Sequence, residues 1–199
     1  MDVWMLNRKI LPNDLLDIFS ALGNLQAQYD WVITDHSMWY GKNCPEAVCK
    51  RWQWTGLLMS GRELTEHLSA GYVWFLDGAV LSAVPLGMRE EDVNLYEPVW
   101  DVDFCAPDYR FQTPLTRLEL ILFDGWAWVI VCNAAFSKLV QSRLPQAQPP
   151  DAFWKAFGYF RPRPCVNPSK AGLPVFIIAG QALRSASVSS PCKNQRTIK

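Results

Sequence analysis

The sequence predicts an α+β fold: a single domain over residues 1–160 with a mixed or mainly antiparallel sheet, helices packed mostly on one face, and an irregular C-terminal tail. Three observations support this prediction. Two apolar runs flank Asp124-Gly125 in LELILFDGWAWVIVC (118–132), which is typical of a hairpin of buried strands. Helix-like and strand-like apolar spacings follow one another along the chain. The 199 residues, 50% of them hydrophobic, are enough to bury one core.

The N-terminal half predicts short elements of both kinds. MDVWML (1–6) predicts an edge strand, and apolar residues three and four apart predict a helix over 12–27. A strand from Trp31, a short helix over 44–52, a strand over 54–61 and a short helix over 62–70 follow. The segment 72–85 predicts either one long strand or a hairpin bent at Asp77-Gly78.

The hairpin strands 118–123 and 126–131 are expected near the centre of the sheet, because both are apolar on both faces. In the second strand, simple alternation places Trp126, Trp128 and Ile130 on one face. We therefore expect this tryptophan pair in the core and not on a binding surface. Helices over 134–143 and 151–157 complete the domain, and the first should pack on the same face as helix 12–27.

Charge divides the chain into an acidic body and a basic tail. Residues 1–160 hold all 19 acidic residues and 12 Lys or Arg, a formal charge of −7, whereas 161–199 hold seven basic residues and no acid. The Pro/Ser-rich tail 161–199 is expected to be disordered or accessory. An acidic body disfavours nucleic acid as the main partner, since phosphate contacts require Lys and Arg.

The remaining composition indicates a cytoplasmic protein without a membrane role. No apolar run reaches the roughly 18 residues that span a bilayer, no basic amphipathic helix is found, and the N-terminus does not read as a signal peptide. In a reducing compartment the six cysteines are expected as free thiols, and their spacing predicts no zinc site. No metal and no cofactor is predicted.

Catalytic motifs are missing, so a non-enzymatic function is favoured. A metal-assisted hydrolase is the first alternative, because His and Asp can hold a divalent metal and orient a general base. Its catalytic candidates are His36 and His67, with Asp101 and Asp103 as further ligands. That alternative requires the two histidines and an aspartate to converge in the fold.

The long segment 86–114 is the main candidate for binding, because a loop of this length in a compact domain is usually functional or disordered. Its acidic residues would steer a cationic protein and its aromatic residues would anchor it. The candidate binding residues are Tyr96, Trp100, Asp101, Asp103, Asp108 and Tyr109. The same loop could instead only fasten itself to the core, or cover a small-ligand pocket lined by aromatic side chains.

The order of elements over about 12–144 resembles small bacterial α+β proteins of the toxin-immunity kind. The segments that carry the resemblance are LLDIFSALG, WVITD, LLMSGRELTEHL, YVWFLDGAVLSAVP and LELILFDGWAWVIVC followed by a helix. The resemblance concerns layout and transfers no catalytic residue. It implies a protein that binds and neutralises a partner, here a basic toxin; the tail 161–199 has no counterpart in it.

Overall fold

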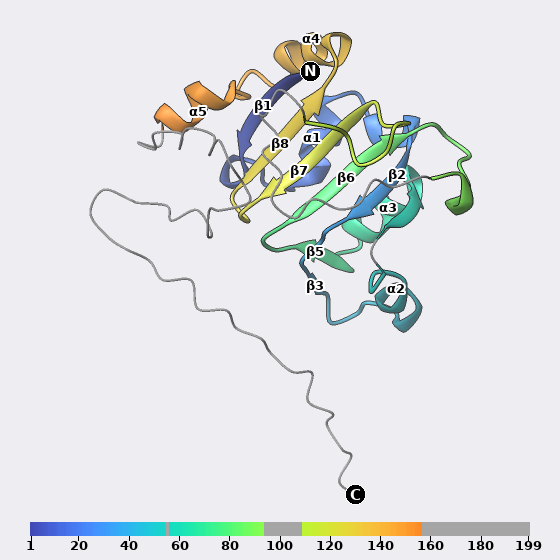
Figure 1. Cartoon of the computed structure of the whole chain (residues 1–199). Coiled ribbons are helices and arrows are strands. Elements are labelled where there is room, and N and C mark those ends of the chain that lie inside the picture. The colour runs from blue at the N-terminus through green and yellow to red at the C-terminus, as the bar shows by residue number, and fades with distance from the viewer. Residues whose placement is uncertain (55, 94–108, 157–199) are drawn as a thin grey trace, which may run out of the picture. The chain divides into compact units, whose positions relative to one another are not determined.

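The computed structural model describes residues 1–54, 56–93 and 109–156 (Figure 1). They belong to the compact unit Met1–Pro164, and residues 165–199 lie outside the described residues. The predicted tail 161–199 and the loop candidates at 94–108 therefore also lie outside the described residues.

A six-stranded sheet organises the unit, in the order β1-β8-β7-β6-β2-β4 (Figure 1). All its described neighbours pair antiparallel. The strands are β1 (Asp2–Asn7), β2 (Asp30–Thr34), β4 (Leu57–Ser60), β6 (Ala79–Val84), β7 (Leu118–Phe123) and β8 (Ala127–Cys132). The predicted α+β fold is confirmed, with β1 at an edge and both hairpin strands inside the sheet.

A second, two-stranded sheet pairs β3 (Met38–Tyr40) with β5 (Val73–Phe75). Here the prediction for 72–85 was wrong in both of its forms. β5 and β6 do not pair with each other, because the chain bends at 76–78 and each strand takes a different partner. The segment between β2 and β3 also bends, at Asp35, whose φ is 42°.

Side chains cap the first turn of two helices. Ser60 Oγ accepts a hydrogen bond from Glu63 N at the start of α3 (Gly61–Ser69), and Asn133 Oδ1 accepts from Ala135 N and Phe136 N at the start of α4 (Ala134–Arg143). The predicted helix 12–27 is interrupted after α1 (Leu15–Ala21), because Gly23 and Asn24 adopt positive φ. The other helices are α2 (Glu46–Arg51) and α5 (Pro150–Ala156), with 3-10 turns η1 (Arg8–Ile10), η2 (Leu25–Gln28) and η3 (Glu90–Asp92).

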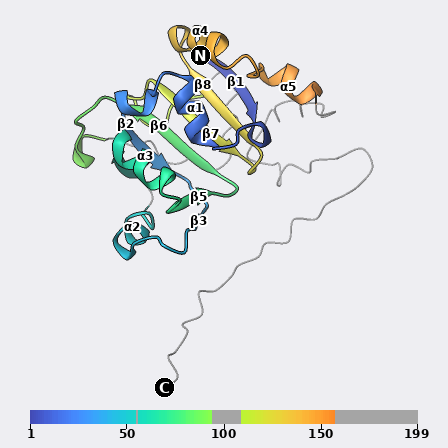
Figure 2. The same cartoon turned by 180° about the vertical axis from the view of Figure 1, so that it is seen from behind.

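The largest core lies between the sheet and the helices on one face. Figure 2 shows α1 and α3 in front of the sheet, and the buried residues of this core come from the sheet, α1, α3 and α4. On the opposite face Phe153 of α5 and Tyr109 cover Ile121, Val129 and Val131. The expectation that helices lie mostly on one face is confirmed, with α5 as the exception.

The β7–β8 hairpin turns as its sequence predicts, but it separates the two tryptophans. Asp124 and Gly125 have φ of 49° and 68°, the pair of positive values that a type I′ turn requires. Trp128 is fully buried in the helix-covered core, as expected. Trp126 instead packs on the opposite core with Phe153 and Trp154, so the prediction that it shares a face with Trp128 was wrong. The reason is that Trp126 belongs to the turn, before β8 and its alternation begin.

Candidate functional site

Of the six binding candidates only Tyr109 lies among the described residues; Tyr96, Trp100, Asp101, Asp103 and Asp108 lie outside them. Tyr109 is buried, and its hydroxyl donates a hydrogen bond to Glu119 Oε2. Glu119 Oε1 accepts from Ser82 Oγ at 2.8 Å and from the backbone N of Gln112 at 2.5 Å. Tyr109 thus ties the chain after residue 108 to β7 and β6.

Glu119 is a buried carboxyl that the sequence analysis did not single out. It is fully buried in β7, and this burial raises its pKa above the ordinary value of 4.5, while the bonds from Tyr109, Gln112 and Ser82 act in the opposite direction. The same burial, together with the negative charge of Glu119, raises the pKa of Tyr109. The signal in the sequence was a single acid inside the apolar run LELILF. The network can fasten the 109–112 segment to the sheet.

The two histidines of the hydrolase alternative contact one indole, that of Trp52. The ring centroids of His36 and Trp52 are 5.8 Å apart, and those of Trp52 and His67 are 6.2 Å apart. Trp52 Nε1 donates to His67 Nδ1 at 3.0 Å, and burial lowers the pKa of His67, so this ring is held neutral within the core. Asp101 and Asp103 lie outside the described residues, and within the described ranges no three His, Cys, Asp or Glu side chains form a metal-binding group.

A hollow of about 410 Å³ lies among η1, the start of α1, the end of α3 and β5. Arg8 and Asp14 line it, and Asp14 has an unusual backbone for a non-glycine residue, with φ 54° and ψ −124°. Its carboxylate accepts from Arg8 Nε and Nη2 at 3.0 and 2.6 Å and from Trp128 Nε1 at 2.5 Å. Arg8 also donates to the carbonyls of Phe75, Leu76 and Gly125. These charges therefore serve the fold, and a ligand here would depend on apolar contacts such as Leu16, Leu68 and Trp74.

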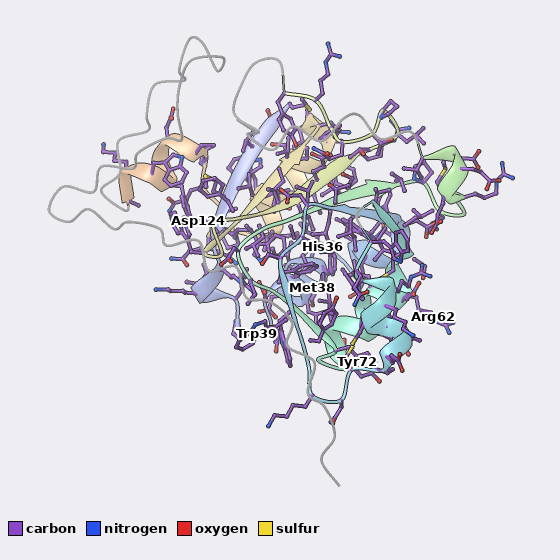
Figure 3. The ribbon with its side chains drawn as sticks, turned by 60° about the horizontal axis from the view of Figure 1, so that its bottom comes forward. His36, Met38, Trp39, Arg62, Tyr72 and Asp124 are labelled. Carbon is purple, nitrogen blue, oxygen red and sulfur yellow. The ribbon has the colours of Figure 1, made fainter. Side chains whose placement is uncertain are left out.

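The outer face of the β3–β5 sheet exposes large aromatic side chains, whereas most other tryptophans of the described residues are buried or partly buried. Trp39 and Trp74 are direct cross-strand partners and are 69% and 50% exposed. Tyr40 is 39% exposed, and Trp54, whose carbonyl lies 3.2 Å from His36 Nε2, is 73% exposed. Tyr40 follows Trp39 in β3 and pairs with the buried Val73, so it belongs to the other face of this sheet. We call Trp39 and Trp74 the aromatic surface. Figure 3 looks onto this end of the molecule, with His36, Met38 and Trp39 labelled along the chain into β3.

A shift of register turns Trp39 outward. In the β2–β6 pair Thr34 faces Val80, whereas in the β3–β5 pair Met38 faces Phe75. Three residues (35–37) therefore separate the two pairs on the β2–β3 side, and four residues (76–79) separate them on the β5–β6 side. A difference of one residue between paired segments acts like a β-bulge and reverses which side chains face the core. Trp31 and Ile33 point into the helix-covered core, and straight alternation would send Trp39 the same way; instead Met38 packs against that core.

Three exposed aspartates belong to loops that join at the base of the aromatic surface. They are Asp35, Asp77 and Asp124, the last labelled in Figure 3. Ser37 N donates to Gly78 O at 2.9 Å, Leu76 N to Ser37 O at 2.8 Å, and Gly125 N to Asp77 O at 2.8 Å, which joins the three loops. None of these aspartates forms an ion pair with another residue in the described part of the chain. We call them the acidic rim.

The sequence analysis missed the aromatic surface and the acidic rim. WY (39–40) and YVW (72–74) read as continuations of strands, and only the pairing of β3 with β5 shows that both tryptophans point outward. The available signal was the Asp-Gly pair at 77–78, which marks a bend between two strand-like segments.

Comparisons with known proteins leave the family open. No protein-family model matches the chain, and neither a curated protein nor a solved structure matches it. Within the described residues, no helix is long and apolar enough to cross a membrane.

Proposed function

We propose that this protein is a protein-binding domain that uses the aromatic surface and the acidic rim to hold a basic protein partner. The observation that carries the proposal is the cross-strand pair Trp39–Trp74, since two large indoles stand exposed on a short sheet whose inner side chains, Val73 and Phe75, are buried. An exposed cluster of large apolar side chains is typical of an interaction site.

The two parts of the surface have different roles in binding. Tryptophan buries a large area at little cost in side-chain entropy, so the aromatic surface supplies the affinity. The unpaired carboxylates of the acidic rim attract a cationic partner and raise the association rate. The formal charge of −7 over residues 1–160 acts in the same direction.

The nature of the partner follows from the resemblance in the order of elements. Proteins of the toxin-immunity kind bind and neutralise a toxin, and we propose a basic toxin as the partner of this chain. We also propose that the complex forms in the cytoplasm, which fractionation of the native cells would test.

The test is a capture experiment with the full chain from the native cell extract, eluted in steps of increasing salt. The variant Trp39→Ala/Trp74→Ala removes the exposed pair, and Leu86→Ala is the matched control because Leu86 is exposed but lies outside the aromatic surface. We expect a basic protein on wild type and on the control, released by salt, and at least a tenfold loss of its affinity for the double variant, about 1.4 kcal/mol. Equal affinity of all three for that protein would contradict the proposal.

The acidic rim is tested by association kinetics with the captured protein. The variant Asp35→Asn/Asp77→Asn/Asp124→Asn keeps side chains that tolerate the positive φ of positions 35 and 124. We expect slower association at low salt, with the difference from wild type shrinking as salt increases. An unchanged association rate at low salt would exclude the acidic rim from steering.

A further inference from the structure

We propose that Cys44 and Cys49 form a reversible redox site, closing an intramolecular disulfide by exchange with a low-molecular-weight disulfide such as oxidised glutathione. The two side chains are free thiols, and Cys49 Sγ lies 2.8 Å from Cys44 Sγ. A disulfide bond is about 2.05 Å long, so the sulfur atoms need to move by less than about 1 Å to form one.

The local fold holds the two thiols together. Pro45 is the N-cap of α2, and Cys49 N donates to Pro45 O at 3.0 Å, so Cys49 lies in α2 and Cys44 directly precedes the N-cap. Cys44 N donates to Gly41 O at 3.0 Å, and the Tyr40 hydroxyl donates to Cys49 O at 3.3 Å. These bonds tie each cysteine to the end of β3, which limits how far the sulfur atoms can separate.

Both thiols are accessible, in contrast to Cys132. Cys44 and Cys49 are partly exposed, whereas Cys132 is fully buried in β8. Partial burial and the hydrogen bond with Cys49 raise the pKa of Cys44 to about 11, so mild alkalinity should speed the exchange. Accessibility and proximity together distinguish this pair from a buried structural cysteine.

The reaction balances as two exchange steps. One protein thiol loses its proton, and the thiolate attacks the small disulfide; a mixed disulfide forms and one small thiolate leaves. The second protein thiol, also deprotonated, attacks the mixed disulfide and expels the second small thiolate. The two protons pass to the two small thiolates, the small disulfide is reduced and the protein dithiol is oxidised. The second step is intramolecular and is favoured by a high effective concentration.

The sequence makes the bond directly measurable. Trypsin cleaves after Lys42 and Lys50, so one peptide, NCPEAVCK (43–50), contains both cysteines. The fully reduced full chain is incubated without air at about pH 8 with reduced and oxidised glutathione until its state is constant, then alkylated, digested and weighed by mass spectrometry. A closed disulfide leaves this peptide two hydrogen atoms lighter than the dithiol, with no alkyl group.

We expect oxidised glutathione to convert peptide 43–50 to this lighter form, and reduced glutathione to reverse the change. The variants Cys44→Ser and Cys49→Ser should each hold a mixed disulfide with glutathione that does not resolve. The peptide containing Cys132 should carry no glutathione and should be alkylated once the chain is unfolded, since that thiol is buried in the folded protein. Peptide 43–50 that stays doubly alkylated, carries two glutathiones, or is cross-linked to another peptide would overturn the proposal. None of these readouts depends on the proposed binding function.

Discussion

Replacing Tyr109 by Phe is expected to destabilise the protein by an amount that grows as the pH rises above 4.5. The substitution removes the hydroxyl that donates to Glu119 Oε2 inside the core, and little else. A hydrogen bond to a neutral group contributes about 0.5–1.5 kcal/mol, and one to a charged group about 1.5–3 kcal/mol. The stability lost in Tyr109→Phe should therefore rise from about 0.5–1.5 kcal/mol, where Glu119 is neutral, toward about 1.5–3 kcal/mol as Glu119 ionises.

Glu119→Gln is expected to show the opposite trend. The folded pKa of Glu119 is raised above its ordinary value of 4.5, so its contribution to stability is full below that pH and is lost as the pH rises through the folded pKa. In that window the wild type loses up to about 1.4 kcal/mol per pH unit, because one proton separates the two states. Glutamine does not titrate, so the stability of this variant relative to wild type should improve with pH.

Both variants are measured by urea unfolding of the full chain between about pH 4 and pH 9, followed by tryptophan fluorescence. His67, with its lowered pKa, makes wild type and variants alike less stable below about pH 6.5, and this effect cancels in the differences. Tyr40→Phe is the control, since that hydroxyl bonds to Cys49 O at the surface and should show no such trend. Differences independent of pH for both core variants would refute the role assigned to Glu119.

Three further outcomes are expected from urea unfolding and from binding. Trp128→Ala removes a fully buried side chain and the donor to Asp14, and should cost about 3–5 kcal/mol; an unchanged midpoint would place this indole outside the core. Gly61→Ala places a Cβ onto the carbonyl oxygen of Gln26, so the backbone must move, at a cost of about 1–3 kcal/mol. Trp39→Ala/Trp74→Ala should change the unfolding free energy by less than about 1 kcal/mol while weakening partner capture, because both indoles are exposed.

Local patterns predicted much of the fold because their physical causes are local. Asp124-Gly125 supplies the positive φ of the hairpin turn, and strict alternation assigns Leu118, Leu120 and Leu122 to the helix-covered face. Ser60 and Asn133 start helices for an equally local reason that the sequence analysis did not use, since their side chains accept hydrogen bonds from the next turn. The α+β class and the antiparallel sheet follow from these signals.

The candidate site depended on contacts between segments that are distant in sequence. Glu119 reads as one acid in an apolar strand, and only the fold brings Ser82, Tyr109 and Gln112 to its two oxygens. His36 and His67, proposed together from the sequence, lie against one indole, and their suggested partners Asp101 and Asp103 lie outside the described residues.

The sequence by itself determined the alternation within each strand, the caps, the turn at 124–125 and the burial of Trp128, since each depends on neighbouring residues and on the apolar faces they form. Tertiary structure alone decided which tryptophans reach the surface. The segments that join β2 to β3 and β5 to β6 differ by one residue between their paired positions, and this difference reverses the face of Trp39. It is visible only when the two segments are compared. Strand register is set by two paired strands together, so the sequence of either strand alone does not determine it.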